Sequence, residues 1–172
     1  MKGKGSFFAG FGAGLLILAG LDQWTKALAA GHLMGKPPVV LLDGVFELYY
    51  SENRGAAFGM LQGRQAFFFL IALAVLAAAA YLLARMPLRR RYMPMAGCLL
   101  LVVSGAVGNM IDRVSQGYVV DFLYFKLIDF PIFNVADCYV TIGAALLVFL
   151  VFFYYKEEEL ACFSGKMREG SQ

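Results

Sequence analysis

The stretch of sequence that decides the fold is residues 66–84, AFFFLIALAVLAAAAYLLA, which contains no charged or amide side chain. A helix of about 20 such residues crosses the hydrocarbon core of a bilayer. Further apolar runs of similar length occupy about 7–30, 93–111 and 136–155. The chain is 60% hydrophobic and 16% charged, whereas soluble domains are roughly 25% charged. We therefore predict a single integral membrane domain over residues 1–172, with four transmembrane helices.

The first apolar run could instead be a cleaved signal peptide, because Lys2 and Lys4 precede it and Ala27-Leu28-Ala29 offers small residues for cleavage. Asp22 and Lys26 do not fit the bland apolar region of a signal peptide. Cleavage would also leave an odd number of spans. We therefore interpret this run as a retained helix.

The basic residues predict the orientation, since Lys and Arg in short loops stay on the cytoplasmic side. Nine of the 15 lie on the side of the two chain ends and six lie on the other side. Both termini and the polar tail 156–172 are therefore predicted to be cytoplasmic, and segments of about 31–65 and 112–135 to be outside. The run Arg89-Arg90-Arg91 is then a cytoplasmic anchor, with no binding of nucleic acid expected.

Both outer segments are expected to be structured at the membrane surface. Asp43-Gly44 separates two β-rich runs and indicates a hairpin with a two-residue loop. Residues 112–133 are rich in aromatic and aliphatic side chains and are expected to lie on the membrane. The predicted fold is an all-α, four-transmembrane-helix bundle with a small extracytoplasmic β-sheet, or cradle, and a membrane-surface loop between the third and fourth helices.

Metal and thiol chemistry have little support in the sequence. Cys98, Cys138 and Cys162 show no CxxC spacing and no neighbouring histidine, and His32 is the only histidine. We therefore expect no disulfide framework, no metal site and no cofactor.

Polar residues instead collect where the spans meet the outer surface. An ionisable group at membrane depth costs several kcal/mol unless it pairs or meets water, so such a group is a functional hint. The residues expected to converge at the outer mouth of the bundle are Asp22, Asn109, Asp112, Arg113, Asp121, Asn134 and Asp137.

Most of these residues also have a purely structural interpretation. Asp22 and Lys26 are four apart and could form an ion pair on one helix face. Asn134 and Asp137 have the spacing of a helix N-cap with an acidic first turn, and Asn53-Arg54-Gly55 could be a simple turn. Asp112-Arg113 could merely close the third helix, and Ser104, Gly105 and Gly108 are expected to be close-packing positions.

The joint arrangement favours chemistry by two carboxylates. Two close carboxylates cannot both ionise cheaply, so the pair holds one proton near neutral pH. The ionised member can take a proton from water while the protonated member polarises a carbonyl. This division of labour needs neither a metal nor a histidine.

Five ordered segments carry a specific resemblance to the bacterial lipoprotein signal peptidases, also called signal peptidase II. The segments are Asp22-Gln23-Trp24-Thr25-Lys26, Asn53-Arg54-Gly55-Ala56-Ala57-Phe58, Gly105-Ala106-Val107-Gly108-Asn109-Met110-Ile111-Asp112-Arg113, Val120-Asp121-Phe122 and Phe133-Asn134-Val135-Ala136-Asp137. Ser104 departs from the glycine that is usual in the family, but it keeps a small residue there.

The resemblance implies roles for particular residues. Asp121 and Asp137 would be the catalytic dyad, and Asp112 would be structural. Substrate-binding residues would be Asn53, Asn109, Arg113 and Asn134, and site-supporting residues would be Asp22, Lys26 and Gly55.

The resemblance also implies the reaction and its setting. The substrates would be diacylglyceryl-modified prolipoproteins, cut just before the lipidated cysteine. The enzyme would be a monomer in the bacterial cytoplasmic membrane, in contact with membrane lipids, with its site at the outer leaflet, and would be inhibited by cyclic depsipeptides.

Two alternatives from other classes stay open. Asp22, Lys26, Asp112 and Asp137 could form the relay of a proton- or ion-conducting subunit, although the middles of the second, third and fourth spans contain no ionisable side chain. A purely structural or assembly role would make Asp121→Asn silent.

Overall fold

The computed structural model describes residues 2–55 and 65–163, without the side chains of Lys2 and Gln65. Outside the described residues lie the motif segment Ala56-Ala57-Phe58 and three of the 15 basic residues that predict the orientation, Arg64, Lys166 and Arg168.

Within the described residues, four helices are long and apolar enough to cross a membrane, as predicted. They are α1 (Lys2–Leu33), α2 (Gln65–Arg85), α3 (Met93–Ser115) and α4 (Val135–Phe149), which continues into the π-helical turn η4 (Leu150–Tyr154). Shorter helical elements are η2 (Arg90–Tyr92), η3 (Lys126–Ile128), α5 (Glu157–Leu160) and η5 (Ala161–Phe163).

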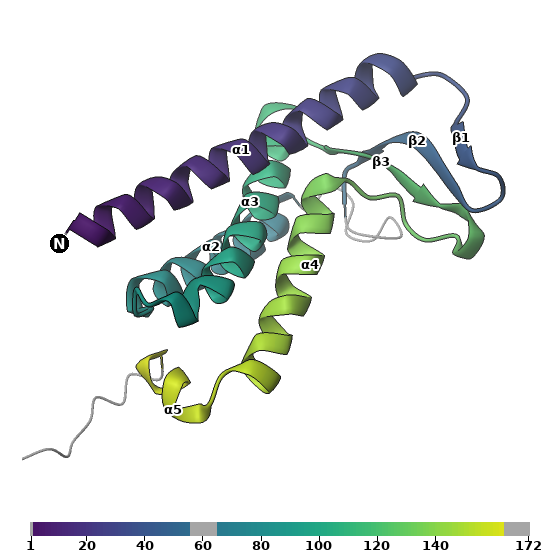
Figure 1. Cartoon of the computed structure of the whole chain (residues 1–172). Coiled ribbons are helices and arrows are strands. Elements are labelled where there is room, and N and C mark those ends of the chain that lie inside the picture. The colour runs from purple at the N-terminus through teal and green to yellow at the C-terminus, as the bar shows by residue number, and fades with distance from the viewer. Residues whose placement is uncertain (1, 56–64, 164–172) are drawn as a thin grey trace, which may run out of the picture.

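Helix α3 is the centre of the bundle and contacts α1, α2 and α4 (Figure 1). Glycines permit the close approach of α3 and α4. A Cβ atom at Gly105 would collide with the carbonyl oxygen of Ala136, and one at Gly143 would lie 2.9 Å from the carbonyl oxygen of Cys98. A Cβ at Gly108 would similarly crowd Asp22 of α1. These contacts confirm the prediction that Gly105 and Gly108 are close-packing positions.

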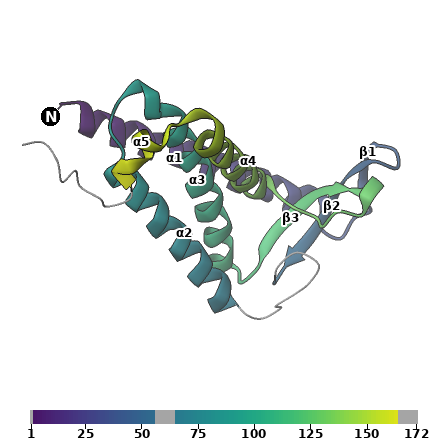
Figure 2. The same cartoon turned by 90° about the horizontal axis from the view of Figure 1, so that it is seen from below.

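A small antiparallel sheet projects from one end of the bundle (Figure 2). Within the described residues it has three strands in the order β1-β2-β3: β1 (Val39–Leu42), β2 (Phe46–Asn53) and β3 (Val119–Phe125). We call the adjoining helix ends the sheet end. The other end, where α1 begins and α4 ends, we call the distal end.

The hairpin at Asp43-Gly44 is confirmed, but its loop is longer than predicted. Leu42 pairs with Phe46 and the Val45 amide donates to the Leu42 carbonyl, so the loop has three residues. Gly44 has φ +67, which a glycine adopts without strain.

The segment between α3 and α4 was predicted to be a membrane-surface loop, and in addition it supplies the strand β3, which was not predicted. Its β-branched and aromatic residues favour a strand, and it pairs with β2, whose edge would otherwise be open. After β3 the chain exposes large apolar side chains, with Leu127 and Ile128 each 69% exposed. That this part lies on the membrane stays a prediction.

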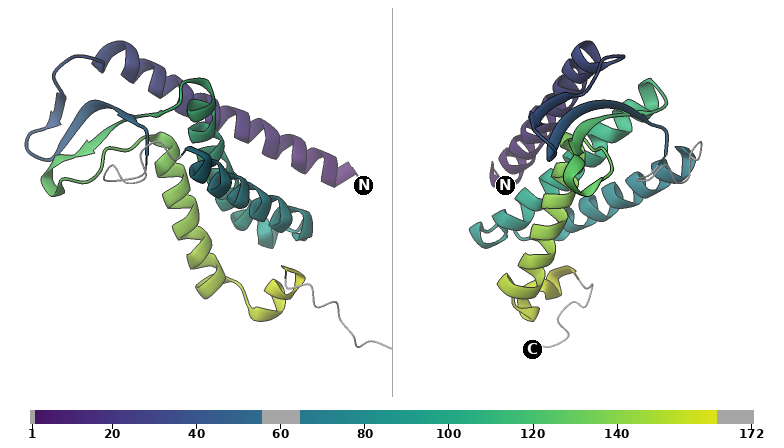
Figure 3. Two further views of the ribbon diagram at one scale, coloured as in Figure 1. Left: turned by 180° about the vertical axis from the view of Figure 1, so that it is seen from behind. Right: turned by 90° about the vertical axis from the view of Figure 1, so that its right-hand side faces the viewer.

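The sheet brings segments from distant parts of the chain next to the start of α4 (Figure 3). Ser51 of β2 pairs with Asp121 of β3. The carbonyl of Phe133, just before α4, accepts from the amides of Phe122 and Leu123. Strand β3 is thereby tied on one side to β2 and on the other to the segment that enters α4.

Candidate functional site

A cavity of about 580 Å³ opens where α2, α3 and α4 meet the sheet. Its walls are mostly apolar, but both carboxyl groups of the predicted dyad reach it. The lining residues are Asn53, Gly55, Phe68, Arg113, Asp121, Phe130, Pro131, Ile132, Phe133, Asp137, Cys138, Thr141 and Ile142.

Asp137 is fixed by the way α4 begins. Asn134 is the N-cap, and its Oδ1 accepts from the Asp137 amide at 3.0 Å. In return, the Asn134 amide donates to Asp137 Oδ2 at 3.1 Å, which completes a capping box. The predicted N-cap is therefore present, and the same contacts hold the carboxyl group at the cavity wall.

Asp121 lies in β3 and is 2% exposed. Its Oδ1 accepts from Asn134 Nδ2 at 2.6 Å, and its Oδ2 accepts from Asn53 Nδ2 at 2.9 Å. Burial, and then the negative charge of Asp137, raise the pKa of Asp121 from 3.8 to about 7, against the two amide hydrogen bonds. This carboxyl group therefore exchanges its proton close to neutral pH.

Asn53 and Gly55 are held together by a local turn. The Gly55 amide donates to Asn53 Oδ1 at 3.0 Å, as in an Asx turn. The turn that the sequence predicted is thus present, and it leaves Asn53 Nδ2 free to donate to Asp121.

Asn109 connects the dyad to a buried charge cluster. Its Nδ2 donates to Asp137 Oδ1 at 2.8 Å. Its Oδ1 accepts from Lys26 Nζ at 2.9 Å and from Asn134 Nδ2 at 3.1 Å. The amide therefore has partners on both sides and cannot rotate without breaking all three bonds.

The charge cluster consists of Asp22, Lys26 and Asp112, all buried. Lys26 Nζ lies 2.9 Å from Asp22 Oδ2 and 3.0 Å from Asp112 Oδ2. Asp22 also accepts from the Ala136 amide at 2.9 Å, and Asp112 accepts from the Val120 amide at 3.2 Å. The ion pair expected from the spacing of Asp22 and Lys26 is present, and it anchors the segments on which Asp121 and Asp137 lie.

Arg113 is the cation that lines the cavity among the residues that the structure describes. Its Nη1 donates to the Asn109 carbonyl at 3.3 Å, and its guanidinium carbon lies 5.0 Å from the centre of the Phe68 ring. No ion pair of the described residues involves Arg113. Its donors are therefore available to a peptide carbonyl.

The predicted site residues divide into two groups. Asn53, Gly55, Arg113, Asp121 and Asp137 line the cavity, and the other four lie behind it. These four are Asp22, Lys26, Asn109 and Asn134.

Sequence reasoning gave no role to Gln23 or to the cavity walls. Gln23 Nε2 donates to Asp112 Oδ1 at 2.8 Å, and its place beside Asp22 in an apolar run was a usable signal. For the wall residues Phe68, Thr141 and Ile142 the sequence offers no such signal, because the sequence does not distinguish a side chain that faces a cavity from one that faces lipid.

Within residues 2–55 and 65–163, no group of three or more His, Cys, Asp or Glu side chains could hold a metal ion. The chemistry available to the described side chains is that of two carboxyl groups beside neutral amide donors and one guanidinium. Such a pair can pass protons to and from a bound water and a carbonyl group.

Comparisons with known proteins show the family of this chain. Residues 15–153 match the family described as signal peptidase (SPase) II. A lipoprotein signal peptidase of Streptococcus thermophilus is 41% identical over 144 residues, covering 84% of this chain and 91% of the relative. One of Caldanaerobacter subterraneus subsp. tengcongensis is 45% identical over 134 residues, covering 77% and 89%.

Two solved structures described as bacterial membrane enzymes have the same fold. Each gives a TM-score of 0.73, one at 29% identity over 96% of both chains and the other at 31% identity over 87% of this chain and 96% of the other. The chain therefore belongs to the signal peptidase II family, the lipoprotein signal peptidases.

Proposed function

We propose that this membrane peptidase is an aspartic endopeptidase in which Asp121 and Asp137 activate water. The observation that carries the proposal is that both carboxyl groups line one largely apolar cavity, and that among the described side chains neutral amides, and no cation, bind their oxygens. Two like charges in such surroundings share one proton near neutral pH. One carboxyl group of the pair is then ionised and can act as a base, and the other is protonated and can act as an acid.

The reaction follows from this sharing. The ionised carboxyl takes a proton from water as the water oxygen attacks the scissile carbonyl carbon, and the protonated carboxyl donates to the carbonyl oxygen. The tetrahedral adduct then collapses: the carboxyl that now holds the proton donates it to the leaving nitrogen, and the other carboxylate takes a proton from a hydroxyl of the adduct as the C–N bond breaks, so the pair again holds one proton. Arg113 and Asn53 lie where they can hydrogen-bond to the substrate main chain.

The walls of the cavity support a lipid-modified substrate. The α4 residues that line the cavity run from Asp137 to Ile142, which is five positions, so the cavity extends roughly 7 Å along α4. We propose that a diacylglyceryl chain lies along this wall while the peptide bond before the lipidated cysteine lies at the carboxyl pair.

The same proposal covers the setting. The sheet end would face the outside of the bacterial cytoplasmic membrane and the distal end the cytoplasm, as the distribution of Lys and Arg indicates. The protein would act as a monomer on prolipoproteins, and cyclic depsipeptides would occupy the cavity and inhibit it.

The test is to incubate purified protein in detergent with a diacylglyceryl-modified prolipoprotein and follow release of the signal peptide. Asp121→Asn and Asp137→Asn should each reduce turnover at least about 10³-fold, because each removes one half of the acid–base pair. Asp43→Asn, in the exposed hairpin loop, is the matched control and should leave turnover unchanged.

Several outcomes would contradict the proposal. Near-normal turnover by either dyad variant would refute the pair and favour a structural role. Cleavage of the unlipidated precursor at the same rate would refute recognition of the lipid, and loss of activity with a chelator would indicate a metal.

A further inference from the structure

The space between α1 and α3 opens toward the distal end of the bundle. At Gly14 the two helices are close, since an added Cβ would lie 2.9 Å from Leu100 Cδ2. At Gly10 of α1 and Gly97 of α3, an added Cβ would meet no atom within 4 Å. The helices therefore leave an apolar groove of about 310 Å³, with Phe7, Phe11 and Leu100 in its walls.

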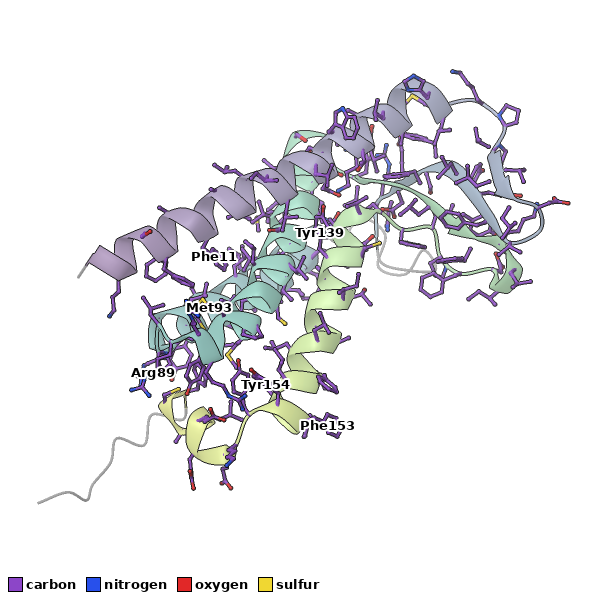
Figure 4. All side chains as sticks on the ribbon, in the orientation of Figure 1. Phe11, Arg89, Met93, Tyr139, Phe153 and Tyr154 are labelled. Atoms are coloured by element: carbon purple, nitrogen blue, oxygen red, sulfur yellow. The ribbon has the colours of Figure 1, made fainter. Side chains whose placement is uncertain are left out.

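A second cavity, of about 690 Å³, adjoins this groove, because Ser6 and Phe7 line both spaces. It is bordered by Lys4 at the start of α1, by Arg89 and Arg90 before α3, and by Met93. Figure 4 shows Phe11, Met93 and Arg89 in this order from the bundle toward the distal end. One continuous space thus changes from apolar to basic.

The basic end of this space has no matching carboxylate among residues 2–55 and 65–163. No Asp or Glu of these residues lines it, and none forms an ion pair with Lys4, Arg89 or Arg90. Arg91 differs, because it binds Glu159 at 2.9 Å and the Tyr154 carbonyl. Two successive arginines are therefore left with donors for an external anion.

We propose that this space binds an anionic glycerophospholipid of the leaflet opposite the sheet end. Its phosphate would lie among Lys4, Arg89 and Arg90, and one acyl chain would lie in the groove along Phe7, Phe11 and Leu100. Leu100 follows Met93 by seven residues, so the groove takes roughly 10 Å of the chain. The charge and the apolar extension together select a lipid, and the site is separate from the carboxyl pair.

The test is to titrate delipidated protein in detergent with single lipids and count bound molecules by native mass spectrometry. Phosphatidylglycerol should bind roughly 10-fold or more tightly than phosphatidylcholine with the same chains. Arg89→Gln/Arg90→Gln should weaken phosphatidylglycerol binding roughly 10- to 30-fold. The matched control Arg85→Gln/Lys156→Gln removes two cations of the same end that do not line the cavity, and it should change binding little.

A second variant tests the groove. Gly97→Leu should fill the open space and weaken phosphatidylglycerol binding, whereas Gly97→Ala should have a smaller effect and thereby control for the helix. Thermal unfolding of each variant would show that it is folded, and signal-peptide release should persist.

Three results would overturn the proposal: equal binding of the two lipids, equal losses in the arginine variant and its control, or no effect of Gly97→Leu. Inorganic phosphate that competes as well as the lipid would indicate a simple anion site instead.

Discussion

Asn109 joins two pairs of aspartates that differ in how their charge is balanced. Asp22 and Asp112 share Lys26 at 2.9 and 3.0 Å and accept backbone amides, and neither lines the cavity. Asp121 and Asp137 line the cavity and accept mainly from neutral side-chain amides.

The contrast separates carboxylates that hold the fold from the carboxylates that we propose to react. A charge that is paired and closed off by protein donors has no reason to change its protonation. Two like charges at a cavity, bound only by neutral donors, exchange a proton readily. The residue type is the same in both pairs, so the hydrogen-bond and charge partners and the access to the cavity make the difference.

The largest effect on stability is expected when the shared cation is removed. Lys26→Met leaves Asp22 and Asp112 buried without compensation and should cost about 3 to 5 kcal/mol of unfolding free energy. Denaturant unfolding in detergent measures this, with Lys36→Met in the exposed loop after α1 as the control. Adding Asp112→Asn should recover part of the loss. If Lys26→Met lost activity without losing stability, Lys26 would act in the reaction. The difference between a structural and a reactive pair of aspartates would then be refuted.

Replacing one aspartate of each pair should change stability in opposite directions. Asp112→Asn weakens the ion cluster and destabilises. Asp121→Asn removes a carboxylate whose charged form is disfavoured in the folded protein, because its pKa is raised to about 7. At pH 8 this variant should be about 1 to 3 kcal/mol more stable than the parent, after allowing for its altered hydrogen bonds.

The stability gained by Asp121→Asn should be larger at high pH than at low pH. Below the unfolded pKa of 3.8, Asp121 is protonated in both the folded and the unfolded protein and does not lower the free energy of unfolding. As pH rises to about 7 the unfolded state loses its proton first, so the parent loses stability and then levels off. Thermal unfolding at pH 4 and pH 8 measures this. A gain of equal size at both pH values would contradict the raised pKa.

A smaller effect, on the rate of the reaction, is expected from replacing Asn109, which joins the two pairs of aspartates. Asn109→Ala removes the donor to Asp137 and should raise the activation barrier by about 1 to 3 kcal/mol. Because Asn109 does not line the cavity, kcat should fall while KM changes little. Asn53→Ala, at the cavity wall, should alter both constants. A KM effect as large for Asn109→Ala as for Asn53→Ala would assign Asn109 to substrate binding.

The sequence predicted the spans and the convergence of polar residues for a simple reason. Long apolar runs have few alternatives to crossing a bilayer, and charges within them must meet one another. The Asp22–Lys26 ion pair and the Asn134 N-cap were predictable because both depend on spacing within one helix.

Features that depend on distant partners were not predictable in the same way. Strand β3 was not predicted, because its partner β2 is more than 60 residues away in the chain. The link through Asn109 needs α1, α3 and α4 to meet at one point. No local pattern contains that information.

The smallest effect is expected from an ion pair with nearly the same geometry as that of Lys26. Arg54 Nη2 lies 2.9 Å from Glu52 Oε2, the distance that also separates Lys26 Nζ from Asp22 Oδ2. The Arg54 and Glu52 side chains are 62% and 34% exposed, whereas those of Lys26 and Asp22 are 3% and 0% exposed. Glu52→Gln should therefore change the unfolding free energy by less than about 1 kcal/mol, as is usual for solvated pairs. A loss comparable to that of Lys26→Met would mean that distance, and not burial, decides what an ion pair contributes here.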